Sequence, residues 1–395
     1  MNRDTRLVAL AFVFWGLGEG LFLHIQPLYI EELGADPVQI GGLLSVAAVV
    51  RAASFLPAGI LADRLPRKPV MVGGWITGLI GVLLVGLARS WQGLLPGLLV
   101  YALSAYCIPV VNAYLAWAVD GQRLARTFTT VFAGYAAGSV VSPAIGGWLA
   151  EFSSMRTVYF VSALLFTLSL LAVVQVNPQP VPTATGQVGR WRPLLSRRFL
   201  GFAACAYATF VAMHLSVPLA PNYLKDVGGW RVARIGVLGS FQAAGAMVLN
   251  PLLGRLGEGA KQKPTSRVHP FSCKLVVKRP VLVAAPGLVV GQALVWIAAL
   301  ILLLAGSFPV LALAYVLRGA YEGCRSLTQA QASELTGEAD RGMLFGATET
   351  IIAIAQIVAP YAAGWLYANS PTYPFVASLA LIPAVLLSRL VAARW

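Results

Sequence analysis

Residues 59–68 read GILADRLPRK, which places four charged side chains within ten positions of an otherwise apolar region. An apolar run near 38–62 leads into this stretch, and a second one near 70–88 follows it. Each run is long enough for a helix that crosses the hydrocarbon core of a bilayer, which takes about 20 residues. The charged stretch is therefore predicted to be a short loop between two membrane-spanning helices.

The composition of the whole chain agrees with a membrane protein. Of its 395 residues, 58% are hydrophobic and 11% are charged. Soluble domains average about 45–50% apolar and about 25% charged residues, so this chain has too few charges to cover a water-exposed surface. A charged start, MNRDTR, precedes more than 20 largely apolar residues. We interpret this as a permanent first span, because a cleaved signal peptide has a shorter apolar core.

The same criterion of length and apolarity predicts twelve spans along the chain. They lie near residues 7–30, 38–62, 70–88, 93–118, 127–150, 156–176, 199–220, 235–256, 280–305, 309–333, 343–367 and 372–391. Residues 177–198 are rich in Pro and Arg and are predicted to form a cytoplasmic linker. The predicted fold is an all-α integral membrane protein with six-helix bundles at 1–176 and 199–395.

The distribution of basic residues predicts the orientation. The chain has 29 Lys and Arg against 15 Asp and Glu, a formal net charge of +14. With a cytoplasmic N-terminus, 21 of the 29 basic residues fall in cytoplasmic segments, five in outer loops, and three inside spans. Cytoplasmic loops of membrane proteins collect Lys and Arg. The pattern predicts a multi-pass protein of the plasma (cytoplasmic) membrane with both termini in the cytoplasm. Because this topology explains the positive net charge, no nucleic-acid partner is expected.

The two halves of the chain repeat each other. The stretch Tyr29–Gly41 reads YIEELGADPVQIG, and Tyr223–Gly236 reads YLKDVGGWRVARIG. Ser45 then matches Ser240 at an offset of 195 residues. Such a repeat predicts two bundles related by an axis along the membrane normal, with a substrate site at their interface near mid-membrane.

The repeat continues through the later spans, with an offset that grows from 195 to 217 residues. The motif SPAIGGWL at 142–149 matches APYAAGWL at 359–366, whereas RKPVMV at 67–72 matches KRPVLV at 278–283. The change of offset indicates a basic cytoplasmic insertion near 260–277. We expect this insertion to be a solvated loop near anionic lipid.

The loop quoted first resembles the signature of the major facilitator superfamily, G-x-L-A-D-R-x-G-R-K. The matching residues are Gly59, Leu61, Ala62, Asp63, Arg64, Arg67 and Lys68, and Pro66 stands where the family usually has Gly. The resemblance implies a transporter with twelve helices that works by alternating access.

The same resemblance implies a latch between the bundles at the cytoplasmic side. Asp63 would dock on the N-terminus of the helix that begins near Gly342, where the helix dipole is positive. Arg67 would reach Asp120. The predicted latch residues are Gly59, Asp63, Arg64, Arg67, Lys68, Asp120, Glu258, Arg279 and Glu334.

Ionisable residues inside the predicted spans are candidates for function, because a charge at mid-bilayer costs at least about 2.5–3.5 kcal/mol. Burial in apolar surroundings favours a protonated carboxyl group, which suits proton coupling. The proton-coupling candidates are Glu19, Glu322 and Glu349, and the substrate-binding candidates are Arg51, Tyr106, Asn112, Gln242, Arg318 and Arg325. Glu19 and Arg51 have a similar depth, which permits a salt bridge. A purely structural ion-paired network is the alternative for these charges.

The sequence predicts a transporter, with the direction left open. The stretch GYAAGSVVSPAIGG at 134–147 resembles the superfamily's antiporter motif, which favours proton-coupled export of drug-like or amphipathic compounds. Uptake of a sugar or organic anion is an alternative, and a non-transporting membrane sensor is an alternative of another class. No catalytic set, metal site or cofactor site is predicted, so we expect no enzyme. The expected partners are a small-molecule substrate, protons and the bilayer, and the chain is expected to be a monomer.

Overall fold

The computed structural model describes residues 3–118, 124–179, 196–259, 286–304, 306–332 and 341–392. For residues 56–64, 116–118, 124–129, 257–259, 341–345 and 389–392 it describes the backbone alone. The chain groups into two compact units. The first comprises 1–187, 217–243 and 357–373, and the second comprises 188–216, 244–356 and 374–395.

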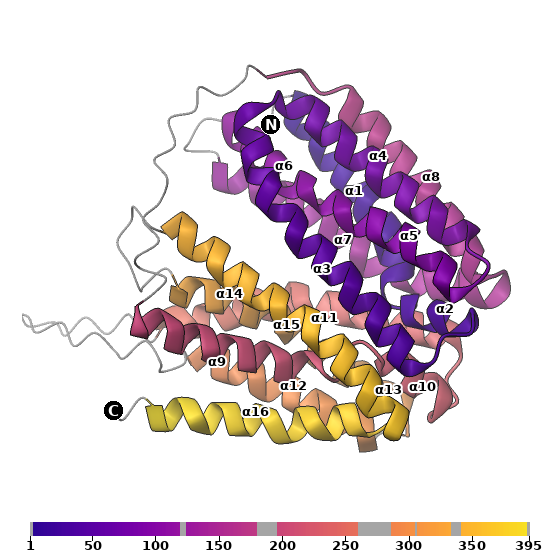
Figure 1. Cartoon of the computed structure of the whole chain (residues 1–395), viewed down its shortest axis with the longest axis vertical. Coiled ribbons are helices and arrows are strands. Elements are labelled where there is room, and N and C mark those ends of the chain that lie inside the picture. The colour runs from indigo at the N-terminus through magenta and orange to yellow at the C-terminus, as the bar shows by residue number, and fades with distance from the viewer. Residues whose placement is uncertain are drawn as a thin grey trace, which may run out of the picture. The chain divides into compact units, whose positions relative to one another are not determined.

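The described residues form helices and no strands. The first unit holds α1 (Arg3–Leu23), α2 (Gln26–Glu32), α3 (Pro37–Arg64), α4 (Arg67–Leu87), α5 (Trp91–Leu103), η1 (Ser104–Tyr106), α6 (Cys107–Ala118), α7 (Leu124–Phe152), α8 (Met155–Val174) and α10 (Ala220–Asp226). The second holds α9 (Arg197–His214), α12 (Pro286–Leu304), α13 (Phe308–Arg318), α14 (Ala320–Ala332) and α16 (Tyr373–Ala392). Two long helices, α11 (Val232–Gly259) and α15 (Arg341–Asn369), contribute residues to both units (Figure 1).

The helices follow the predicted spans. Eight described segments are long and apolar enough to cross a membrane, namely α1, α3, α4, α5 through α6, α8, α11, α12 and α15. Together with α7, α9, the α13–α14 pair and α16, they correspond one to one to the twelve predicted spans. The predicted all-α membrane fold is confirmed.

Four of the predicted spans are shorter or less regular than expected. In the seventh, α9 ends at His214, and in the tenth, Gly319 separates α13 from α14. The first ends at Leu23, and a separate short helix begins at Gln26, where Pro27 occupies the first turn. The fourth is interrupted by the 3-10 turn η1, just before Pro109. Proline lacks an N–H group and its ring crowds the carbonyl group four residues earlier, which disfavours a continuous α-helix at this point.

Hydroxyl groups join α1, α4 and α8 through the core of the first unit. The indole Nε1 of Trp75 donates to Ser169 Oγ at 2.7 Å, and Ser169 Oγ donates to the Ala11 carbonyl oxygen at 2.7 Å. Ser162 Oγ likewise donates to the Gly18 carbonyl oxygen at 2.8 Å. Interhelical hydrogen bonds from such side chains stabilise membrane bundles, and these hold α1 against α8 at Ala11 and Gly18, in the part of α1 that precedes Glu19.

Candidate functional site

Glycines of α1 allow α7 to approach closely. A Cβ atom on Gly16 would lie 2.3 Å from the Tyr135 carbonyl oxygen, and one on Gly20 would lie 2.0 Å from Ser142 Oγ. Only residues without a side chain fit such a crossing, as in other close helix pairs of membrane proteins. The sequence GLGEG around Glu19 therefore brings the backbone of α7, and with it Tyr135, next to the Glu19 carboxylate.

The carboxylate of Glu19 accepts a hydrogen bond on each oxygen. Tyr101 on α5 donates to Oε1 at 2.6 Å, and Tyr135 on α7 donates to Oε2 at 2.7 Å. These short distances are typical of hydrogen bonds to an ionised carboxylate. Three helices thus converge on one half-buried acidic group inside the membrane-spanning region, an arrangement that can hold a negative charge or exchange a proton.

Arg51 does not form the salt bridge that its predicted depth permits. In the described part of the chain, the side chain of Arg51 has no ion pair with Glu19 and is exposed. The two phenols occupy both oxygens of the Glu19 carboxylate instead. Arg51 therefore keeps a cationic group near the cluster without neutralising it by direct contact.

A second polar cluster lies in the second unit, between α14 and α15. Arg325 donates to both oxygens of Glu349, from Nε to Oε1 at 3.2 Å and from Nη2 to Oε2 at 2.5 Å. Gln329 Nε2 also donates to Glu349 Oε1. About two turns farther along α15, Gln356 Nε2 donates to the Tyr321 hydroxyl at 3.3 Å. A two-point arginine–carboxylate pair is geometrically specific, so this cluster fastens α14 to α15.

The three charges of predicted helix 10 do not act as one stripe. The guanidinium of Arg318 is buried and lies 4.8 Å from the centre of the Tyr315 ring, a cation–π distance. Gly319 interrupts the helix directly after it. Glu322 is exposed, and Arg325 is paired with Glu349. The break separates Arg318 from Glu322 and Arg325, which both lie on α14.

The remaining substrate-binding candidates lie in the first unit. A Cβ atom on Gly73 would lie 2.8 Å from the Tyr106 hydroxyl, so this phenol packs against α4. The Oδ1 atom of Asn112 is buried and has no hydrogen-bond partner among the described residues. Gln242 on α11 is half-buried.

Most of the predicted latch falls outside the described side chains. This applies to Gly59, Asp63, Arg64, Asp120, Glu258, Arg279 and Glu334. Arg67 is described, and its Nη1 donates to Gln179 Oε1 at 3.0 Å. Gln179 Nε2 in turn donates to the Tyr114 carbonyl oxygen on α6 at 3.1 Å. Lys68 is half-buried at the start of α4. The insertion near 260–277 also lies outside the described residues.

The small residues of α7 serve helix packing on two sides. A Cβ atom on Gly138 would lie 2.7 Å from the Leu17 backbone nitrogen, and one on Gly146 would lie 1.8 Å from the Leu21 carbonyl oxygen, both on α1. A Cβ atom on Gly147 would instead lie 2.8 Å from the Val232 carbonyl oxygen on α11. The residues that resemble the antiporter motif therefore form the crossings of α7 with α1 and α11.

Sequence reasoning did not single out the two phenols that bind Glu19. They lie 82 and 116 residues away from it, and uncharged tyrosines are common in membrane helices. One signal was available for Tyr135, because it is a lone aromatic side chain among the small residues of GYAAGS. Where every neighbour is small enough for close helix contact, a large polar residue points to a defined partner.

Comparison with known proteins identifies the family. The model of the Major Facilitator Superfamily matches residues 8–268. The chain belongs to the major facilitator superfamily. The superfamily's solved structures include a bacterial homologue of the human lysosomal transporter Spinster, in an inward-facing and occupied conformation, with a TM-score of 0.75, 16% identity, and coverage of 99% of this chain and 96% of that one. The nucleoside transporter NupG gives a TM-score of 0.73 at 13% identity, over 99% of this chain and 98% of that one.

Relatives identified by sequence similarity include proteins named for multidrug resistance. The multidrug resistance protein MdtG of Enterobacter lignolyticus (strain SCF1) is 27% identical over 273 residues, which cover 65% of this chain and 65% of that protein. MdtG of Klebsiella pneumoniae (strain 342) is 28% identical over 259 residues, 62% of each chain. The similarity thus spans just under two thirds of these relatives. The chain is a multi-pass membrane protein of a superfamily that includes bacterial drug-resistance proteins.

Proposed function

We propose that this protein is a proton-coupled secondary transporter that exports drug-like or amphipathic organic compounds by alternating access. The proposal is supported by family membership and by the similarity to proteins named for multidrug resistance. It places the chain in the cytoplasmic membrane as a monomer with both termini inside. The moving parts are six-helix bundles at 1–176 and 199–395, with the substrate bound between them near mid-membrane.

The observation that carries the coupling is the pair of phenols on Glu19. In its ionised form this carboxylate accepts from both O–H groups, whereas a protonated oxygen donates, so one phenol must accept in place of donating and loses its charge-assisted hydrogen bond. Proton uptake at Glu19 thus changes the contacts of α1 with α5 or α7. A cationic substrate competes with the proton for the same carboxylate, and this competition couples outward movement of substrate to inward movement of protons.

The second unit supplies a brace and a further carboxylate. Arg325 and Glu349 neutralise each other, so their expected role is to hold α14 against α15. Glu322 lies one turn before Arg325 and is exposed. Its carboxylate is therefore the second candidate for a proton or for the positive charge of a substrate. Arg318, buried against Tyr315 on the preceding helix, stays a candidate for binding an anionic group.

An accumulation assay with a substrate panel tests the direction and the substrate class. Cells that express the chain should retain less of a fluorescent lipophilic cation than cells with an empty vector, and collapse of the proton gradient should remove the difference. Accumulation of a sugar or of an organic anion should not change. Increased accumulation of either would favour uptake, and an unchanged panel would favour a non-transporting sensor.

Replacement of Asp63 with Asn tests the cytoplasmic latch. If Asp63 stabilises the state closed to the cytoplasm by its charge, the neutral side chain should lower the export rate by about fivefold or more, because the dipole interaction of a helix N-terminus requires a negative partner. The amount of protein in the membrane should stay the same, as measured by immunoblot of membrane fractions. An unchanged export rate would remove Asp63 from the mechanism.

A further inference from the structure

The first unit contains an ion pair between repeat-equivalent positions. Lys225 Nζ lies 3.2 Å from Glu31 Oε2. Both residues belong to seven-residue helices, α2 and α10, which lie against each other (Figure 1). Each residue is the sixth of its helix, and the two helices are aligned by the internal repeat.

The position of this pair follows from the repeat. A two-fold axis exchanges the two copies, so equivalent side chains can touch each other only near the axis. Identical charges at such a position would repel, whereas Glu in one copy and Lys in the other attract. Asn222 Nδ2 strengthens the pair by donating to the same Glu31 oxygen at 2.7 Å.

Two further hydrogen bonds join repeat-equivalent positions of the two halves. Ser45 Oγ on α3 accepts from the Tyr361 backbone N–H on α15 at 3.1 Å. Ser240 Oγ on α11 accepts from the Ala144 backbone N–H on α7 at 3.1 Å. Ser45 and Ser240 are repeat equivalents, and so are Ala144 and Tyr361. Each bond joins one half of the sequence to the other, and both lie within the first unit.

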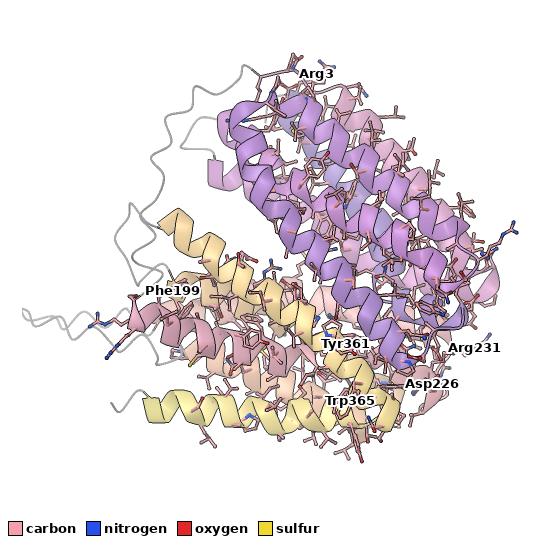
Figure 2. All side chains as sticks on the ribbon, in the orientation of Figure 1. Arg3, Phe199, Asp226, Arg231, Tyr361 and Trp365 are labelled. Carbon is pink, nitrogen blue, oxygen red and sulfur yellow. The ribbon has the colours of Figure 1, made fainter. Side chains whose placement is uncertain are left out.

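The helices that carry these serines cross closely in both copies. A Cβ atom on Gly41 would lie 2.3 Å from the Pro360 carbonyl oxygen, and one on its equivalent Gly236 would lie 2.4 Å from the Pro143 carbonyl oxygen. Figure 2 labels Tyr361 and Trp365 on α15 at this end of the unit, together with Asp226 and Arg231. We name this set of contacts the α2–α10 closure.

A charged helix cap adds to the closure on one side only. In the first copy, Asp36 caps α3 locally. Its Oδ1 accepts from the Gln39 N–H at 2.8 Å, and its own backbone N–H donates to Gln39 Oε1 at 3.0 Å. The equivalent position in the second copy is Arg231. There Glu151, from the other half of the sequence, accepts from the Ala233 N–H at 2.8 Å and pairs with Arg231. The first turn of α11 therefore depends on a cap that only the closed arrangement supplies.

We propose that Glu31 and Lys225 form an axial lock that holds the α2–α10 closure together and sets how readily this end opens. The predicted topology puts the closure at the outer face, so the lock must break in each cycle before a compound is released outside. The proposal rests on the alternating access proposed above. The half-exposed ion pair, with 41% of the Lys225 and 27% of the Glu31 side chain accessible, suits a contact that can be broken at modest cost.

Charge reversal and exchange test the lock without any transported compound. Spin labels at the exposed positions Leu23 and Val227, in a chain with its cysteines replaced, would report the distance across the closure by double electron–electron resonance. K225E and E31K should each raise the share of the longer distance by about five- to tenfold, since an attraction becomes a repulsion of similar size. The double variant E31K/K225E should return the distribution to that of the parent.

Matched variants keep the test decisive. Arg89 is also exposed and charged but makes none of these contacts, so R89E should leave the distance distribution unchanged. If a reversal reduces insertion, the neutral variants E31Q and K225Q should still shift the distribution in the same direction. Unchanged distributions in the single variants, or a double variant as open as the single ones, would overturn the lock. The spin-label distances and the export assay can also give different answers. If the distances change as expected but the chain exports no compound, the proposed function is refuted and the lock is not.

Discussion

Replacement of Glu19 with Gln is expected to lower export driven by a proton gradient by about tenfold or more. Glutamine keeps the size of the side chain, and its carbonyl oxygen still accepts from one phenol, but it cannot bind or release a proton. The loss should therefore appear in the stimulation of transport by the gradient, with the yield of folded protein unchanged. Initial transport rates in proteoliposomes, measured with and without an imposed pH gradient, give the stimulation by the gradient for the parent chain and for E19Q.

Two companion variants make the Glu19 result specific. Glu32 on α2 is outside the cluster, so E32Q should keep the full stimulation by the gradient. E322Q examines the exposed carboxylate on α14. If E19Q keeps gradient-driven export and E322Q loses it, Glu322 becomes the coupling residue. Full gradient-driven export in both variants would end the coupling hypothesis.

Replacement of Gly146 with Ala is expected to abolish or strongly reduce folding of the first unit. The added methyl group would lie 1.8 Å from the Leu21 carbonyl oxygen, a backbone atom that cannot move without displacing α1. Overpacking of a close-packed interface costs about 1–3 kcal/mol of folding free energy. Because the added methyl group would meet backbone atoms, we expect the cost of G146A to lie at the upper end of this range or above it. Monodispersity in fluorescence-detected size-exclusion chromatography and the apparent Tm in detergent would measure the effect.

The matched control is Gly346, which is also helical. Among the described residues, no atom outside its own stretch of helix lies within 4 Å of a Cβ built on it, and alanine favours a helix over glycine by about 1 kcal/mol. G346A should therefore leave the apparent Tm unchanged or raise it slightly. A G146A protein as stable as G346A would show that α1 and α7 do not cross as closely as described.

The sequence predicts the fold well because the bilayer imposes simple rules. Apolar length predicted segments that correspond to the described helices, eight of which are long and apolar enough to cross a membrane. It did not predict the interruptions within apolar runs, at 24–25, at η1 and at Gly319. The composition does not change at these points, and at the first two the backbone geometry of Pro27 and Pro109 decides the outcome.

The site was predictable only in part, for a physical reason. A charge inside a span is visible in the sequence, so Glu19 could be named, whereas its partners Tyr101 and Tyr135 are neutral and distant along the chain. The axial lock shows the same limit. The repeat aligned Glu31 with Lys225, but the contact between them depends on how the two copies pack, which no local pattern encodes.

Substrate-induced proton movement tests the central claim most directly. Proteoliposomes that contain the protein and a trapped pH-sensitive dye would receive a lipophilic cation on one side. If Glu19 couples export to protons, the parent chain should give a proton flux opposite in direction to the cation flux, and E19Q should give a proton flux at the level of empty vesicles. Transport of the cation by the parent without any movement of protons would contradict this coupling.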